Sequence, residues 1–295
     1  MIRNVGHIGP LKVIALVTWQ LRGTILAIAV VIGLLIPIPD ATQSAYASAV
    51  LSVLGIGASV FIAFRNTTGY NRWWEARTLW GSVIIGSRTT HNALTAVDTG
   101  TLEIAEILDR MRRRQVRYVW QLNAEMRGRT APELALELTP EDPAEIDSTE
   151  LLNRQAADVA TLAAGGHIDT QARLLLMNAN SATAAAQSGL ERIRNEPVPV
   201  QYDFFIRGMA WFFGVMAFSR LDGDTHSASS VVVGILLMGT FVVAERLGRF
   251  LENPMSGSVF DIPMNQICSV ISGNLLGAGH PLVSLRGAPK DVVWM

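Results

Sequence analysis

The chain has 295 residues, of which 49% are hydrophobic and 17% are charged, whereas an ordinary soluble domain is about 25% charged and a disordered chain is far less apolar. Its 24 Lys and Arg residues nearly balance its 25 Asp and Glu residues, so it lacks the bulk positive charge that nucleic-acid binding needs. The single cysteine, Cys268, excludes an intrachain disulfide and a Cys-x-x-Cys metal or redox site.

Four stretches poor in charged residues predict membrane-spanning helices. The first two lie on either side of Asp40, with 17 uncharged residues before it and 24 after it, and a spanning helix needs about 20 residues. The third is the weakest, because its uncharged core, Gly208–Ser219, has 12 residues, while the fourth has 18 and ends at Glu245. The alternative for each is a buried core helix, but such helices seldom run this far without a polar stripe. We therefore predict a polytopic all-α membrane protein with spans at 23–39, 45–64, 203–220 and 227–244.

Positive charge precedes the first span. Residues 1–22 contain Arg3, Lys12 and Arg22 and no acidic residue. Because Lys and Arg are retained on the cytoplasmic side of a membrane, both termini are expected in the cytoplasm. The long regions 65–202 and 245–295 then lie on the same side.

Region 65–202 predicts long cytosolic helices. Apolar residues recur at roughly helical spacing over 101–126, a loop rich in Pro and acidic residues covers 139–150, and a further helix covers 169–194. Several arginines cluster on the first of these helices, and they predict either a solvated helix face, which we favour, or a site for phosphate or lipid headgroups. These arginines are Arg110, Arg112, Arg113, Arg114 and Arg117.

One face of the second span repeats at steps of four residues. It begins with small polar side chains and ends with bulky apolar ones, in the order Ser48, Ser52, Ile56, Val60 and Phe64. If copies of this helix surround an axis, the last three form a narrow apolar constriction, which is a hydrophobic gate, and the two serines line the outer pore. The alternative is an ordinary ridge that faces lipid or the helix bundle, and spacing alone favours that alternative.

A charged and aromatic segment follows this span. Trp73, Trp74 and Trp80 are expected to form an aromatic belt at the membrane interface. Arg72 and Glu75 are spaced as a helical i,i+3 ion pair.

The order of residues in this segment resembles the bestrophin family, in particular its bacterial branch. The motif that carries the resemblance consists of Phe64, Arg65, Asn66, Tyr70, Arg72, Trp73, Trp74, Glu75 and Arg77, followed by Leu79-Trp80-Gly81. Two later elements appear in the family's order, namely Pro197, Pro199 and Tyr202 before the third span, and Asn253, Pro254 and Asp261 after the fourth. The resemblance extends from about residue 10 to residue 277.

This resemblance implies a homopentameric ion channel of the bacterial inner membrane, with 1–295 as a single channel domain and four spanning helices per subunit. Family members typically conduct chloride or other anions, although a bacterial relative is associated with cation conduction. The family's pore neck, aligned on its motif, corresponds to Ile56, Val60 and Phe64. A second, cytosolic aperture corresponds to Gln171, by an alignment with little identity to support it.

The sequence departs from the family where eukaryotic members bind calcium through a cluster of acidic residues. In 255–261, Asp261 is the single acidic residue, and Ca²⁺ needs six to eight oxygen ligands. We therefore expect no calcium clasp and no other metal or cofactor. The scattered histidines form no zinc motif, and neither a phosphate-binding loop nor a nucleophile elbow is present, so an enzyme is not predicted.

The sequence thus predicts an ion channel that binds lipid bilayer and permeant ions. A non-conducting scaffold or sensor is the rival hypothesis, and a secondary transporter is disfavoured because no inverted repeat or charge within the spans is seen. The sign of the permeant ion is not set by the uncharged neck. Anions are favoured by the family majority alone, with Asp40, Asp222, Asp224, Arg65 and the arginine cluster as candidate selectivity residues.

Overall fold

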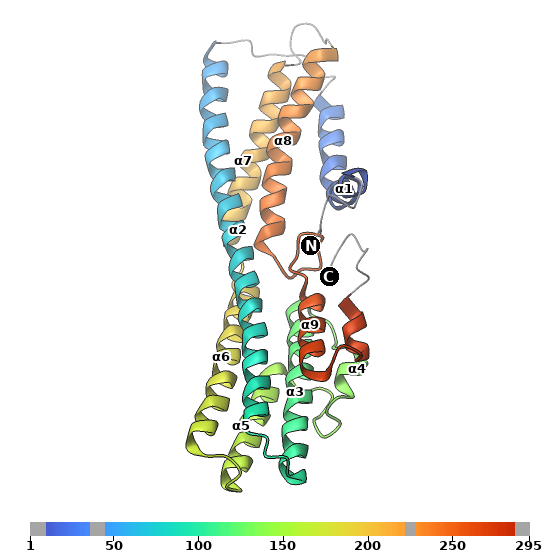
Figure 1. Ribbon diagram of the computed structural model, residues 1–295. Helices are drawn as coiled ribbons and strands as arrows, with labels where there is room; N and C mark the ends of the chain where they lie inside the picture. The colour runs from blue at the N-terminus through green and yellow to red at the C-terminus, as the bar shows by residue number, and fades with distance from the viewer. Residues whose placement is uncertain (1–9, 36–44, 222–227, 287–295) are drawn as a thin grey trace.

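The computed structural model describes residues 10–35, 45–221 and 228–286, which form helices and loops without a strand. Figure 1 shows two helical parts arranged end to end. The upper part contains α1 (Pro10–Leu35), the first half of α2 (Ala45–Ala96), α7 (Val200–Leu221) and α8 (Ala228–Glu252). The lower part contains the second half of α2 together with α3 (Leu102–Arg127), α4 (Glu133–Leu136), α5 (Ser148–Ala164), α6 (Thr170–Asn195), α9 (Met264–Leu276) and the 3₁₀ helix Pro281–Arg286.

The upper part is a bundle of apolar helices. α7 and α8 pack along each other and along α2, while Ile28 and Ile32 of α1 pack against Phe218, Met238 and Val242. Among the described residues, three helices are long and apolar enough to cross a membrane, and they comprise Ile14–Leu35 of α1, Ala49–Ala96 of α2 and Ser229–Glu252 of α8. α7 is not one of the three, although it belongs to the same bundle.

The predicted spans correspond to these four helices with shifted limits. The first, 23–39, falls on α1, and its last four residues lie outside the described part of the chain. The third, 203–220, lies within α7, and its status as a membrane span stays a prediction. The fourth, 227–244, falls on α8, which continues eight residues further, to Glu252.

The second predicted span, 45–64, does not end at a helix terminus. α2 continues without a break for 52 residues, a length of about 78 Å at 1.5 Å per residue, and thereby joins the two parts of the molecule (Figure 1). Where α2 crosses α8, Gly69 faces the backbone of Gly248, and a Cβ at Gly69 would lie 2.8 Å from the Gly248 carbonyl oxygen. Glycine therefore permits the close approach that fixes α8 against the middle of α2.

The lower part has a mixed core of aromatic and aliphatic side chains. Trp80 of α2, Trp120 of α3 and Ile271 of α9 are buried in one cluster. Asp147 and Asp169 cap the N-termini of α5 and α6 by accepting hydrogen bonds from the backbone N–H of Glu150 and Ala172, each at 2.7 Å. The helix predicted at 169–194 is confirmed as α6 within one residue at each end.

Two arginines of the α3 cluster, Arg114 and Arg117, are internal to this part, so the expectation of a solvated helix face was wrong for these two, while Arg110, Arg112 and Arg113 are partly exposed. Arg114 and Arg117 are 4% and 0% exposed. Arg114 pairs with Asp142 at 2.8 Å and also with Asp158, and Arg117 donates to the Thr139 backbone oxygen at 2.9 Å. These two arginines therefore attach the acidic loop 139–147 and α5 to α3, and the charge of Arg114 is neutralised there by two carboxylates.

Candidate pore-lining face and the adjoining ion-pair cluster

One face of α2 presents large apolar side chains that no described residue of the subunit covers. Ile56, Val60 and Phe64 are 68%, 46% and 62% exposed, and their spacing of four residues places them on one side of the helix. Ser52 is exposed one step earlier on the same face, and the side chain of Ser48 lies outside the described part. An exposed apolar ridge of this kind is typical of a surface that contacts lipid or other copies of the chain, or that lines an apolar constriction between copies.

The opposite face of α2 is fixed by packing against α7. Ala58 and Ile62 are buried there beside Ala210 and Phe213. A Cβ at Gly55 would lie 2.8 Å from the Phe213 ring, so the ring occupies the space that a larger residue would need. This packing sets the direction in which the exposed ridge points.

An apolar groove runs beside the ridge. Its volume is about 550 Å³, and Ser52, Ile56 and Val60 of α2 line it together with Phe213 of α7 and Phe241 of α8. The groove therefore extends the uncovered apolar surface from α2 onto its two neighbours.

Arg65, the residue after Phe64, is the centre of a buried ion-pair cluster. It is 0% exposed and pairs with Asp203 of α7 at 2.5 Å and with Glu245 and Glu252 of α8 at 3.1 and 2.7 Å. Arg249 joins the cluster through Glu245 at 2.6 Å. Buried charges are stable only when paired and hydrogen-bonded, so these five residues tie α2, α7 and α8 together directly beside the ridge.

The pairing of these arginines with carboxylates limits which residues can determine ion selectivity. Arg65 is neutralised by three carboxylates and does not present a free positive charge, which disfavours it as a selectivity residue. Four arginines of the α3 cluster are likewise paired with carboxylates, whereas Arg117 donates to backbone and hydroxyl oxygens. Asp40, Asp222 and Asp224 lie outside the described residues.

Arg72 of the family motif donates hydrogen bonds to the C-terminal ends of two helices. Its Nε donates to the Glu252 backbone oxygen at 2.9 Å, and its Nη2 donates to the Ile193 backbone oxygen. Glu252 ends α8 and Ile193 lies in the last turn of α6, where carbonyls have no partner within their own helix. The expected Arg72–Glu75 ion pair is not formed among these contacts, because Glu75 pairs with Arg192 of α6.

The aromatic residues of the motif have different environments. Trp73 donates through its indole N–H to the Phe260 backbone oxygen at 3.0 Å, and Tyr70 stacks on Trp73 and Trp74 at centroid distances of 6.1 and 6.4 Å. Trp74 is exposed, whereas Trp80 is fully buried in the lower core. The expected aromatic belt was therefore wrong for Trp80.

The remaining motif residues on α2 are half-buried. Asn66 lies against Gly248, where a Cβ would collide with the Asn66 side-chain oxygen, and Arg77 lies further along the helix. Both belong to the stretch of α2 between the ridge and the lower core.

The two later motif elements form the connections around α7 and α8. Pro197 and Pro199 separate α6 from α7, and the Pro199 carbonyl accepts hydrogen bonds from the backbone N–H of Tyr202 at 3.0 Å and of Asp203 at 3.2 Å. Asn253 and Pro254 begin the loop after α8.

Asp261 closes that loop. Its carboxylate accepts hydrogen bonds from the Ser258 hydroxyl at 2.6 Å and from the Gly257 backbone N–H at 2.5 Å, and it is almost fully buried. In the described part of the chain, no three His, Cys, Asp or Glu side chains gather into a possible metal site. The absence of a calcium clasp and of any cofactor stays a prediction.

Gln171 is exposed in the first turn of α6, at the opposite end of that helix from Pro197. Its role as a cytosolic aperture is a prediction.

Cys268 is not a candidate nucleophile, because its Sγ donates to the Val119 backbone oxygen at 3.3 Å and burial raises the pKa of its thiol.

Sequence reasoning missed the three carboxylates that surround Arg65. Asp203 is the first residue of the predicted span 203–220 and Glu245 follows the charge-free run of the fourth span, so both were interpreted as span boundaries. A signal existed, because an acidic residue at a span boundary needs a cationic partner if it is buried.

Comparison with known proteins identifies the family. A model described as Bacterial/Fungal Bestrophin protein matches residues 10–277. The voltage-dependent anion channel-forming protein YneE of Escherichia coli K12 is 29% identical over 235 residues, which cover 76% of this chain and 74% of that protein. The protein of that name from Salmonella typhi is 27% identical over 231 residues, with coverages of 76% and 74%.

Solved structures agree with this assignment. A bacterial bestrophin homologue from Klebsiella pneumoniae matches with a TM-score of 0.72 and 25% identity, over 90% of this chain and 93% of that one. A second crystal structure, described as that of a membrane protein, has the same fold, with a TM-score of 0.76, 24% identity and coverages of 88% and 100%. The chain therefore belongs to the bacterial and fungal bestrophin family.

Proposed function

We propose that this chain is the subunit of an anion channel in the bacterial inner membrane, in which five copies surround one axial pore and both termini are cytoplasmic. Membership of the bestrophin family and the names of the curated relatives, which are called anion channel-forming proteins, support this function. The apolar helices α1, α2 and α8 support placement in a membrane, with α7 as the fourth span. Chloride is the physiological anion that we expect to pass.

The exposed ridge of α2 carries the proposal for the pore. Ile56, Val60 and Phe64 form the neck, with Ser48 and Ser52 toward its outer mouth and Gln171 at a cytosolic aperture. Rings of these apolar side chains hold water poorly, so ions cross when the rings widen. The packing of α7 behind α2 supports a fixed orientation of the ridge.

Chloride efflux from proteoliposomes tests this function. The vesicles contain KCl, the outside solution contains an impermeant salt, and a chloride electrode follows release. An anion channel releases chloride only when valinomycin allows potassium to leave with it, because bulk charge must stay balanced. We expect fast efflux after valinomycin and none before it, relative to protein-free vesicles.

The same assay separates an anion channel from the two rival functions. A cation-selective channel adds no chloride release to that seen with valinomycin alone, and a non-conducting scaffold leaves the vesicles indistinguishable from protein-free ones. Either result contradicts the proposal.

A further inference from the structure

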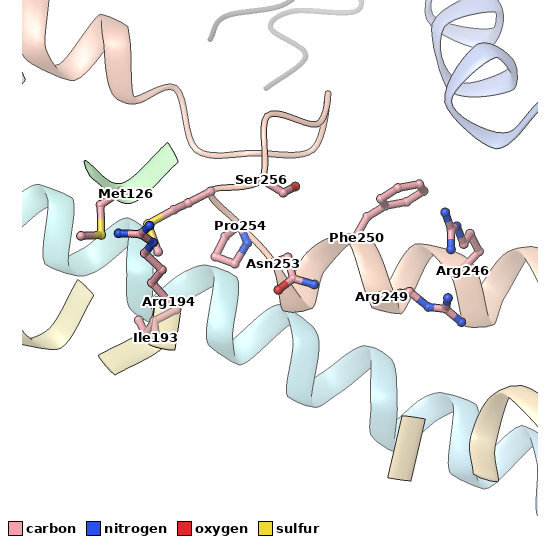
Figure 2. Close-up of a pocket in the computed structure, with 10 residues that line it drawn as sticks. Met126, Ile193, Arg194, Arg246, Arg249, Phe250, Asn253, Pro254 and Ser256 are labelled. Atoms are coloured by element: carbon pink, nitrogen blue, oxygen red, sulfur yellow. The ribbon is translucent and has the colours of Figure 1, made fainter. Parts of the chain in front are cut away.

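A pocket lies where α8 ends, on the side of the molecule that joins the two parts. Its volume is about 310 Å³, and its walls come from the last turns of α8, the loop that follows and the end of α6. Figure 2 shows Arg194 with Met126 at one end of the pocket, Arg246 and Arg249 at the other, and Asn253 and Pro254 between them. Guanidinium groups thus stand at both ends of one cavity.

The charges of these arginines are not equally neutralised. Arg249 pairs with Glu245 at 2.6 Å in the cluster around Arg65. Arg194 and Arg246 form no ion pair with any residue that the structure describes, and no carboxylate lines the pocket. The pocket therefore has an excess of positive charge on its walls.

Arg246 is held in place without using its hydrogen-bonding capacity. Its guanidinium carbon lies 5.0 Å from the centroid of the Phe250 ring, a cation–π contact that restricts the side chain. Its Nε is buried and has no hydrogen-bond partner among the described residues. A bound acceptor would therefore contact the terminal nitrogens of this guanidinium, which suit acceptor oxygens.

The other walls are mainly apolar, with Asn253 and Ser256 as the uncharged polar residues among them. Met126, Phe250 and Pro254 line the pocket between and beside the arginines. Arg246 lies two residues after Ala244, where the charge-free run of α8 ends, so one end of the pocket is at the level expected for the membrane surface. An anion with an organic portion matches this combination of surfaces better than a bare halide does.

We propose that this pocket binds a phosphate-bearing anion, whose polar groups contact Arg246 at one end of the pocket and Arg194 at the other. Arginine presents several N–H donors in a plane, which suits phosphate oxygens. Two sources share this chemistry: the headgroup of an anionic phospholipid at the membrane surface, and a phosphate ester free in solution. Binding at this site is separate from ion conduction, so it is measured without currents.

The purified full-length assembly in detergent provides the test. Its thermal unfolding midpoint is followed while phosphatidylglycerol in mixed micelles is added in one series and inorganic phosphate in another, with phosphatidylcholine and NaCl at equal ionic strength as references. A ligand that binds the folded state raises the midpoint with concentration, which gives an apparent Kd. We expect phosphatidylglycerol, inorganic phosphate or both to raise the midpoint beyond their references, and the responding series identifies the source.

Variants assign the binding to the pocket. The double variant Arg194→Gln/Arg246→Gln is expected to weaken binding by about tenfold or more, since each charge-assisted hydrogen bond accounts for a factor of that order. Arg194→Gln alone gives a smaller loss of binding affinity. The fold should be unchanged in this variant, because the Arg194 side chain is exposed and forms no ion pair with a described residue. Arg173→Gln is the matched control, because Arg173 is also exposed on α6 but lies in its first turns, away from the pocket.

Three results would overturn the proposal. The first is a midpoint that responds to neither probe beyond its reference. The second is full affinity in the double variant, and the third is an equal loss of affinity in Arg173→Gln, which would indicate general charge attraction instead of a site.

Discussion

Arg65 is a fully buried cation whose charge is balanced by Asp203, Glu245 and Glu252. Removing it leaves three carboxylates in a shared site, where Arg249 is the remaining arginine that forms an ion pair with them. Breaking a buried pair costs about 3–5 kcal/mol, because the remaining charge stays uncompensated. We therefore expect Arg65→Gln to lower the thermal unfolding midpoint of the purified protein strongly.

Arg192→Gln is the control for this prediction, because the Arg192–Glu75 pair also links α2 to another helix but its side chains are 57% and 46% exposed. An exposed pair contributes about 1 kcal/mol or less, so its midpoint should stay close to that of the wild type. Equal effects of the two substitutions would show that the Arg65 cluster is not a stabilising feature.

Asp142 gives a prediction that depends on pH. Burial alone would raise the pKa of its carboxyl, but hydrogen bonds and charge from Arg114, together with Arg154, hold this pKa below its ordinary value. The folded pKa is therefore below the unfolded one, so the carboxylate stabilises the fold above pH about 4, and this contribution is lost as pH falls through the folded pKa. We expect Asp142→Asn to cost about 3 kcal/mol at pH 7, and the difference from the wild type to shrink below about pH 4.

Asp109→Asn is the matched control, since Asp109 pairs with Arg113 on the surface of α3 and is 59% exposed. Unfolding measured at several pH values should show almost no effect of this change. A destabilisation by Asp142→Asn that stays constant from about pH 7 to about pH 3 would contradict the role assigned to the ionised carboxylate.

At the scale of the element, α2 combines a ridge facing outward with a face packed on α7. If the ridge is the pore neck, shortening its side chains widens the apolar rings and lowers the barrier to ions. We expect the triple variant Ile56→Ala/Val60→Ala/Phe64→Ala to raise single-channel conductance in planar bilayers.

A triple variant of α8 provides the control, because Val232, Val233 and Leu236 are also large, apolar and exposed. Replacing these three by Ala should leave the conductance unchanged. The neck assignment fails if the α2 variant conducts like the wild type, or if the α8 variant raises conductance to the same extent.

The same helix shows what could be predicted from sequence. The charge-free run before Arg65 located the first part of α2, and steps of four residues located the ridge, because both are local patterns. The continuation to Ala96 was not predicted, since Arg65 was interpreted as the end of a span. Its partners are 138 to 187 residues away in the chain, and no local pattern reveals that such an arginine is buried.

Trp80 and Arg114 illustrate the same limit. A tryptophan near a span boundary is typical of a membrane interface, but Trp80 packs against α3 and α9 in the lower core. A run of arginines is typical of a solvated face, yet Arg114 finds Asp142 and Asp158 on other elements. In both cases tertiary packing decided the environment, and the residue type alone could not.

At the scale of the whole molecule, α2 joins the upper bundle to the lower helical part (Figure 1). The bundle is apolar, and the lower part combines an aromatic and aliphatic core with buried ion pairs. The Arg65 cluster lies at the junction, next to the ridge on one side and to the arginine-lined pocket on the other, since Arg249 belongs to both. Any rearrangement of α8 relative to α2 would therefore act on the candidate neck and on the pocket together.

The proposed anion channel is tested most directly by the reversal potential of the purified protein in a planar bilayer under a KCl gradient. Potassium and chloride have equilibrium potentials of opposite sign under these conditions, so one value reports the permeability ratio. We predict a reversal potential close to that of chloride, and wild-type currents smaller than those of the triple α2 variant. A reversal potential close to that of potassium, or the absence of current at every voltage, would contradict it.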